Sequence, residues 1–441
     1  MGKYFGTDGV RGKFGDDLTV ELAASLGHAA AIVLGRGHPR PRVLIGRDTR
    51  ASGEPLEQAL IAGIARAGGE ALLAGVIPTP AVARLTSLYD CQAGAVISAS
   101  HNPAPDNGIK FFGSDGMKLP DAVEDDIEAV LEHGDGDPEE AGKATVLTDA
   151  EERYLSFLLD GAISLKGLRV VVDCANGAAY RVAPEAYRRA GADVIAFGTE
   201  PDGQNINDGV GSTHPEKIQE VVLAHEAHVG IAHDGDADRL IAVDERGELV
   251  DGDQVLAICA LEARARGALP NNAVVSTVMA NLGFRRAMSE AGIEVVETGV
   301  GDRYVLEAML ERGIAIGGEQ SGHLIFLDRH TTGDGILTAL RLMGVMAGTG
   351  KPLSELAKAA PRAPQVLLNV RDVNKEALEQ ASAVWEVVHV VEAELGGNGR
   401  VLVRPSGTEP VIRVMVEATT EDAAIAAAER IAAAIRTTLS L

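Results

Sequence analysis

The sequence predicts an α/β protein with three similar mixed-sheet α/β domains and a smaller α+β domain at the C-terminus, arranged around one central cleft. Two patterns carry this prediction: a βαβ pattern that occurs three times, and a C-terminal segment from about residue 367 that lacks it. The chain of 441 residues is also about three times as long as a typical single domain. We expect the domains to cover residues 1–150, 151–252, 253–366 and 367–441.

The repeat is marked by a gapless match among residues 67–75, 190–198 and 291–299, which read AGGEALLAG, AGADVIAFG and AGIEVVETG. Each copy reads as a helix end marked by glycine and followed by a short apolar strand. Another apolar strand precedes each copy, beginning at residues 42, 169 and 273, and a third follows, beginning near residues 93, 228 and 313. Continuous apolar strands are typical of a parallel sheet that helices cover on both faces.

A polar loop and a return strand follow the third strand of each copy. The loops are SASHNP (98–103), DGDADR (234–239) and GEQSGH (318–323). Ligands of open α/β sheets bind beyond the carboxyl ends of strands, so we expect the three loops to face one cleft. The C-terminal segment instead shows a strand, a turn and a strand from Arg400 and closes with an alanine-rich helical pattern, which predicts a small α+β domain.

Composition and charge exclude several classes of function. With 40 basic and 64 acidic residues, the net charge of −24 repels nucleic acid and anionic membranes, so the site of a small anion must be locally basic. No apolar run is long enough for a membrane span, and the N-terminus lacks an apolar leader. The three cysteines are scattered and form no CxxC pair, which argues against disulfides or zinc and favours the cytoplasm.

The loop DGDADR places Asp234, Asp236 and Asp238 at alternate positions directly after a strand. Three converging carboxylates repel one another unless a cation neutralises them, and oxygen ligands without His or Cys favour Mg2+ or another hard divalent ion. An EF-hand is excluded, because Arg239 stands where that loop needs glycine. A phosphatase whose nucleophile is a strand-terminal Asp, and a solvated acidic turn, stay open as alternatives.

The loop SASHNP places Ser98, Ser100 and His101 in a turn fixed by the Asn-Pro dipeptide that follows. Serine beside histidine suggests an activated nucleophile, but no G-x-S-x-G elbow surrounds it. A serine-rich turn that only bonds its own backbone is the alternative. Lys110, on the return strand, could supply a cation or, if desolvated, a proton shuttle, although most such lysines lie at the surface.

Two further segments carry polar groups suited to a sugar phosphate. RPSGTEP predicts an anion nest of backbone N–H groups and hydroxyls with bidentate arginine donors, and a plain hairpin turn is its alternative. GEQSGH offers hydrogen-bonding partners for sugar hydroxyls, although a single histidine is more often structural than catalytic. The residues concerned are Arg404, Ser406, Gly407 and Thr408 in the first segment, with Arg413 on the strand that follows it, and Glu319, Ser321 and His323 in the second.

Taken in order, TDGVRG near the N-terminus, SASHNP, DGDADR, GEQSGH and RPSGTEP resemble the motifs of the α-D-phosphohexomutase superfamily, and the likeness covers the whole chain. Within it, the opening KYFGTDGVRG, the segment GVGDRYV (299–305) and the Gln of GEQSGH most resemble the bacterial phosphoglucosamine mutases.

The resemblance implies roles for individual residues. Ser100 matches the serine that carries a phosphoryl group, with Ser98, His101 and Asn102 beside it. Together with Ser100, the three aspartates match the ligands of one Mg2+ per subunit. The positions that match groups proposed to assist proton transfer are His323, Arg11 and Lys110. The positions that match sugar, phosphate or loop contacts are Glu319, Ser321, Arg239, Arg404, Ser406, Gly407, Thr408 and Arg413.

The implied activity interconverts glucosamine 6-phosphate and glucosamine 1-phosphate through a phosphoserine enzyme. Glucosamine 1,6-bisphosphate is the implied intermediate and activator, and the product feeds UDP-N-acetylglucosamine and cell-wall precursors. A phosphoglucomutase or phosphomannomutase, a metal-dependent sugar phosphatase using Asp234, and a non-catalytic sugar-phosphate sensor are the alternatives. The expected partner is a small sugar phosphate, neither nucleic acid nor membrane, and the sequence leaves open whether the chain acts as a homodimer.

Overall fold

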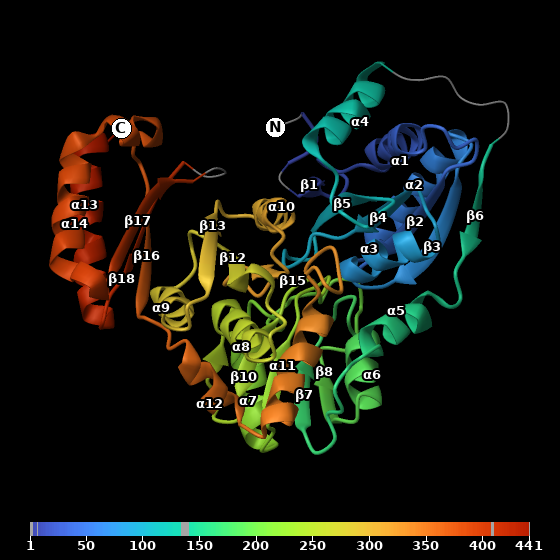
Figure 1. Ribbon diagram of the computed structural model, residues 1–441. Helices are drawn as coiled ribbons and strands as arrows, with labels where there is room; N and C mark the ends of the chain where they lie inside the picture. The colour runs from blue at the N-terminus through green and yellow to red at the C-terminus, as the bar shows by residue number, and fades with distance from the viewer. Residues whose placement is uncertain (1–2, 7, 134–140, 407–409, 441) are drawn as a thin grey trace. The chain divides into compact units, whose positions relative to one another are not determined.

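The computed structural model describes residues 3–6, 8–133, 141–406 and 410–440. Its chain divides into two compact units, one formed by residues 1–279 and 293–359 and the other by residues 280–292 and 360–441. The first unit contains three sheets and the second contains one (Figure 1). The predicted fold class is therefore confirmed.

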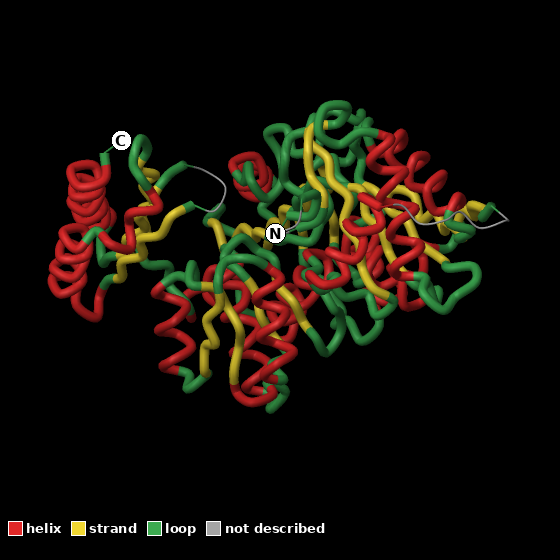
Figure 2. Tube along the Cα trace, turned by 90° about the horizontal axis from the view of Figure 1, so that it is seen from above, coloured by secondary structure: helices red, strands yellow, loops and turns green. Residues whose placement is uncertain are grey.

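The first sheet has the strand order β1-β5-β4-β2-β3-β6, in which only β1–β5 and β4–β5 pair antiparallel. β2 presents Val43 and Ile45 to the core formed with α1 and α2, whereas a Cβ on Gly46 would meet Val82 of α3 on the other face. Helices thus cover both faces (Figures 1 and 2), which explains the continuous apolar strands. The elements are β1 (Val10–Lys13), α1 (Val20–Leu34), β2 (Arg42–Arg47), α2 (Gly53–Arg66), β3 (Glu70–Val76), α3 (Thr79–Leu88), β4 (Ala93–Ile97), β5 (Asp106–Gly113), α4 (Asp121–His133) and β6 (Lys143–Val146).

The second sheet has the order β11-β10-β9-β7-β8. β8 and β9 each pair parallel with β7, and β10 returns antiparallel to β9. The elements are α5 (Ala150–Leu159), β7 (Arg169–Asp173), α6 (Val182–Arg189), β8 (Asp193–Phe197), α7 (Glu216–Ala224), β9 (Val229–Ala232), β10 (Ile241–Asp244) and β11 (Leu249–Val250).

The third sheet has the order β13-β12-β14-β15. Here too, three strands are parallel and the last one returns antiparallel. The elements are α8 (Gly252–Ala265), β12 (Ala273–Thr277), β13 (Glu294–Thr298), α10 (Asp302–Arg312), β14 (Ile316–Gly318), β15 (Leu324–Phe326), α11 (Gly335–Thr349) and α12 (Leu353–Leu356). The helix between β12 and β13, α9 (Leu282–Glu290), is part of the second unit.

One four-strand arrangement recurs in these sheets, as β3-β2-β4-β5, β8-β7-β9-β10 and β13-β12-β14-β15. The predicted threefold repeat is therefore present in the structure. In each copy the third strand runs into one of the three polar loops, so residues 98–103, 234–239 and 318–323 occupy equivalent places. None of the described helices combines the length and the apolar character that crossing a lipid bilayer requires.

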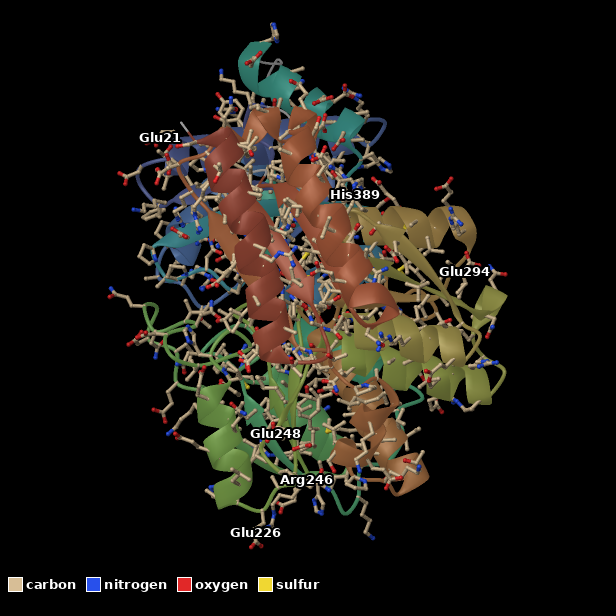
Figure 3. The ribbon with its side chains drawn as sticks, turned by 90° about the vertical axis from the view of Figure 1, so that its left-hand side faces the viewer. Glu21, Glu226, Arg246, Glu248, Glu294 and His389 are labelled. Carbon is tan, nitrogen blue, oxygen red and sulfur yellow. The ribbon has the colours of Figure 1, made fainter. Side chains whose placement is uncertain are left out.

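The second unit is built on the antiparallel sheet β16-β18-β17. α9 belongs to it, and the backbone N–H of Leu282 donates to Glu417 Oε1 over 3.2 Å. The two long helices α13 and α14 lie side by side, with His389 on α13 (Figure 3). The elements are β16 (Gln365–Val370), α13 (Ser382–Leu395), β17 (Arg400–Pro405), β18 (Ile412–Glu417) and α14 (Glu421–Leu439).

Candidate active site

Ser100 lies in the loop after β4, and its hydroxyl points at the aspartate loop of the second sheet. Ser100 Oγ donates a hydrogen bond to Asp234 Oδ2 over 2.5 Å and lies 3.3 Å from Nδ1 of His101. Ser98 Oγ accepts the Ser100 backbone N–H at 3.0 Å. Ser100 is 2% exposed, and its φ of +50° is in the left-handed region, so the surroundings must hold it there.

Three buried side chains hold this loop. The guanidinium of Arg50 donates to the carbonyl oxygens of Ser100 and Asn102, at 3.1 and 2.8 Å, and its Nε donates to Asp48 at 2.9 Å. From the second domain, the amide of Asn207 donates to the same two carbonyls at 2.9 and 3.0 Å. These bonds satisfy carbonyl groups that the irregular loop cannot pair internally, and so they fix the serine.

The three aspartates converge, as their alternation predicted. Asp234, Asp236 and Asp238 are each at most 6% exposed, and one carboxylate oxygen of each lies within 4.8 Å of the others. Burial and the two neighbouring carboxylates raise the pKa of Asp234 well above its usual range, and burial with Asp236 raises the pKa of Asp238. Burial also acts on Asp236, but Lys110 and the Thr79 hydroxyl, which donates over 2.6 Å, lower its pKa overall.

This aspartate cluster fits a hard cation. The Oδ1 atoms of Asp236 and Asp238 are buried and have no hydrogen-bond partner within the described part of the chain. Buried acceptors are nearly always satisfied, so two unsatisfied oxygens in one cluster point to a bound cation. An all-oxygen donor set is the one that Mg2+ and similar ions prefer.

A series of opposite charges lies beside the cluster. Asp8 pairs with Lys110 at 3.0 Å, with Lys118 at 2.9 Å and with Arg11. Lys118 also donates to both oxygens of Asp302, at 2.8 and 2.9 Å. Burial lowers the pKa of Lys110, but neighbouring carboxylates led by Asp8 raise it above its usual range. Lys110 is therefore held beside Asp8 at the edge of the aspartate cluster, and its part in proton transfer stays a prediction.

A cavity of about 310 Å³ opens beside Ser100, large enough for a sugar phosphate. Loops of all three α/β domains line it, which agrees with the expected shared cleft. The lining residues are Asp8, Arg11, Ser100, Asp238, Arg239, Val300, Gly301, Asp302, Arg303, Tyr304, Glu319 and His323.

His323 and Glu319 present polar groups to this cavity. His323 is 3% exposed, and neither ring nitrogen has a hydrogen-bond partner among the described residues. Its Nε2 lies 3.9 Å from Asp238 Oδ2. Glu319 Oε1 accepts the backbone N–H of Gly301 at 3.1 Å, so the β13–α10 loop orients it. Ser321 is exposed and does not line the cavity.

Arg404 of the RPSGTEP segment faces a second arginine, Arg413, on the strand that follows. Arg404 and Arg413 are direct partners across β17 and β18, and burial together with Arg413 lowers the pKa of Arg404. Like charges on facing residues destabilise a sheet, and a bound anion would offset this repulsion. Lys375 donates to the backbone oxygen of the buried Ser406 at 2.9 Å. Two expected site residues lie outside the described residues, Gly407 and Thr408.

Sequence reasoning had not singled out several residues that shape the site. Asp8 and Asp302 stand in segments quoted above, TDGVRG and GVGDRYV, but no role had been given to them. Asp48 and Arg50 come just after β2. Because ligands of open α/β sheets bind beyond the carboxyl ends of strands, this position could have marked them as candidates. No local pattern marks Lys118.

Comparisons with known proteins agree with this geometry. Sequence models of the phosphoglucomutase/phosphomannomutase domains match residues 2–137 (alpha/beta/alpha domain I), 152–247 (domain II), 251–363 (domain III) and 367–435 (C-terminal domain). A phosphoglucosamine mutase of Symbiobacterium thermophilum is 56% identical over 447 aligned residues that cover 100% of both chains.

Two solved structures show the same fold. A phosphoglucomutase/phosphomannomutase family protein of Burkholderia thailandensis superposes with a TM-score of 0.84 at 25% identity, over 99% of this chain and 98% of that chain. An Aspergillus fumigatus N-acetylphosphoglucosamine mutase in complex with GlcNAc-6P and magnesium gives a TM-score of 0.64 at 17% identity, over 99% and 96%.

Proposed function

The chain belongs to the phosphoglucomutase/phosphomannomutase family, and on that premise we propose that it is a phosphoglucosamine mutase. It interconverts glucosamine 6-phosphate and glucosamine 1-phosphate, an intramolecular phosphoryl transfer. The full-length relative at 56% identity supports the choice of sugar. The observation that carries the chemistry is Ser100 Oγ, held 2.5 Å from a buried aspartate cluster at the edge of a sugar-sized cavity.

In the proposed cycle, Ser100 begins as phosphoserine. A sugar hydroxyl attacks its phosphorus, so that a P–O bond to the sugar forms and the P–O bond to Ser100 Oγ breaks. The hydroxyl proton passes to His323, whose ring nitrogens have no protein partner among the described residues. Glucosamine 1,6-bisphosphate then turns round, its other phosphoryl group returns to Ser100, and the leaving sugar oxygen takes up the proton.

Fixed charges support this transfer. We assign one Mg2+ per chain to Asp234, Asp236, Asp238 and the oxygen of Ser100, where a bound ion would neutralise charge on the transferring group. Arg11 and Arg239 line the cavity and offset the negative charge of the phosphate. His101 lies beside the Ser100 hydroxyl, and Lys110 pairs with Asp8. Glu319 orients sugar hydroxyls, and we retain the exposed Ser321 as a candidate for the same role.

We assign the phosphate that is not transferred to the RPSGTEP segment. Two facing arginines beside a buried serine support this assignment, because an anion offsets their repulsion. The candidate residues are Arg404, Ser406, Gly407, Thr408 and Arg413.

We also propose that the four domains divide the work: residues 1–150 carry the phosphoserine, 151–252 the metal, 253–366 the sugar contacts and 367–441 the second phosphate. The matches of four separate family domains support this division. We place the enzyme in the cytoplasm because its three cysteines are buried free thiols, whereas homodimer formation stays a prediction for sedimentation analysis.

A coupled assay tests the function. Glucosamine, glucose and mannose 6-phosphates are compared in the presence of Mg2+ and catalytic amounts of the matching bisphosphate, and glucosamine 6-phosphate is expected to give the highest kcat/KM. A wide margin for glucose 6-phosphate would contradict the assignment of the sugar. Intact-protein mass spectrometry should find one phosphoryl group, which Ser100→Ala abolishes.

The same assay separates the other reaction classes. Ser100→Ala should lose nearly all mutase activity, whereas a phosphatase using Asp234 would retain turnover in that variant. A sensor would bind sugar phosphate without acquiring phosphate on Ser100. Ser25→Ala is the matched control, because within the described part of the chain the Ser25 hydroxyl bonds only a carbonyl oxygen of its own helix.

A further inference from the structure

Lys118 does not line the cavity, yet it holds two carboxylates that do. Its ammonium lies 2.9 Å from Asp8 Oδ1 and 2.8 and 2.9 Å from the two oxygens of Asp302. Asp8 comes from the N-terminal segment of the first domain and Asp302 from the start of α10 in the third. The lysine side chain is 13% exposed and that of Asp302 25%, so water screens the pair only partly.

We propose that Lys118 is a positioning residue of the phosphoryl-transfer reaction. Lys118 joins the first and third domains beside the cavity and neutralises two carboxylates of the cavity wall. The inference rests on the proposed function, because it concerns the same cavity. It assigns Lys118 a part in catalysis that acts entirely through Asp8 and Asp302.

The first consequence concerns the shape of the cavity wall. Asp302 follows Gly301, whose φ of +136° few other residues adopt, and the N–H of Gly301 is the donor that orients Glu319. Asp302 also accepts the N–H of Arg303 at 2.8 Å. Lys118 therefore fixes one end of the loop on which the position of Glu319 depends.

The second consequence concerns charge. Asp8 retains Lys110 and Arg11 as partners when Lys118 is removed. Among the described residues, the only other basic side chain within 4.0 Å of Asp302 is His323, whose imidazole at 4.0 Å is a cation only when it is protonated. Without Lys118, the cavity would gain an uncompensated carboxylate on the path of a substrate that is itself an anion.

The contact between the two domains does not depend on Lys118 alone. Arg303 donates to the backbone oxygen of Leu119 at 2.9 Å and pairs with Asp121, which joins the same two domains. We therefore expect a variant at Lys118 to fold and to keep the contact between the two domains. What it should lose is the alignment of the Asp302 side chain.

The test compares three substitutions in the full-length, Mg2+-loaded enzyme with glucosamine 6-phosphate. Lys118→Met should lower kcat/KM about 100-fold, because it leaves a partly buried carboxylate unpaired. Lys118→Arg keeps the charge and should stay within about tenfold of wild type. Adding Asp302→Asn to Lys118→Met removes the uncompensated charge and should restore about tenfold. Lys351→Met is the matched control, since it breaks a 2.8 Å lysine–glutamate pair at the surface.

Activity of Lys118→Met within about threefold of wild type would overturn the proposal, and so would a double variant that shows the product of the single losses. Hydrogen exchange over residues 299–305 should accelerate in Lys118→Met, and unchanged exchange would also contradict it. If that variant does not fold by circular dichroism, Asp302→Asn alone decides, with a loss of at least about tenfold expected. If wild type prefers another hexose phosphate, the proposed function fails while the Lys118 comparison proceeds with that sugar.

Discussion

Replacing Arg50 with methionine tests whether buried charge holds the phosphoserine loop. The side chains of Arg50 and Asp48 are both 0% exposed and lie 2.9 Å apart. Methionine keeps much of the apolar stem but removes the donors to the carbonyl oxygens of Ser100 and Asn102. It also leaves the Asp48 carboxylate with only the Ser98 hydroxyl and one backbone N–H as donors.

Breaking a buried ion pair from one side costs about 3–5 kcal/mol, and we expect the lower end for Arg50→Met. Burial raises the pKa of Asp48 even though Arg50 opposes it, so without the arginine the acid takes up a proton more readily and relieves part of the cost. At about 2–4 °C per kcal/mol, the melting temperature of the unit that contains Ser100 should fall by about 6–12 °C. The loss should be smaller at pH 5.5 than at pH 8, because protonated Asp48 needs no cation.

Calorimetry and the coupled assay check this prediction together. With the loop released, kcat should fall about 5- to 150-fold, because the left-handed conformation of Ser100 costs about 1–3 kcal/mol without support. The control is Arg36→Met, whose pair with Asp126 is at the surface, with 64% and 48% exposed side chains, and should change stability by at most about 1 kcal/mol. A variant at Arg50 that melts within about 2 °C of wild type and keeps its kcat would refute the reasoning.

Three further outcomes are expected. Mg2+ at a hundredfold excess over its Kd should stabilise the wild-type protein by about 2.7 kcal/mol. Asp238→Asn should lose most of the rise in melting temperature that Mg2+ causes, and equal rises in the two proteins would contradict the metal site. Burial raises the pKa of Glu124 to about 7 despite Arg303, so the folded state binds more protons than the unfolded state between pH 4.5 and 7. Wild type should therefore lose stability relative to Glu124→Gln as pH rises from 5 to 8, and a constant difference in melting temperature would oppose this. Arg413→Met should raise KM for the sugar phosphate about tenfold or more, since it removes a phosphate donor beside Arg404; an unchanged KM would count against the phosphate site.

Much of the fold could be predicted because its signals are local. β4 is buried at all five positions, and its continuous apolar sequence follows directly from having helices on both faces of a parallel sheet. The aspartate cluster was predictable for a similar reason, since Asp234, Asp236 and Asp238 stand within five residues at the end of a strand. A short segment largely determines such a geometry on its own.

The sequence by itself thus determined the repeated sheets, the loops at their carboxyl ends and the grouping of three carboxylates. Only the tertiary structure decided which charges meet: Lys118 binds Asp302 across 184 residues, and Asn207 reaches the Ser100 carbonyl across 107. It also placed Lys110 3.0 Å from Asp8, a pairing that no local pattern predicts. The physical reason is that pairing and protonation depend on distance and desolvation between separate domains, and neither leaves a pattern along the chain.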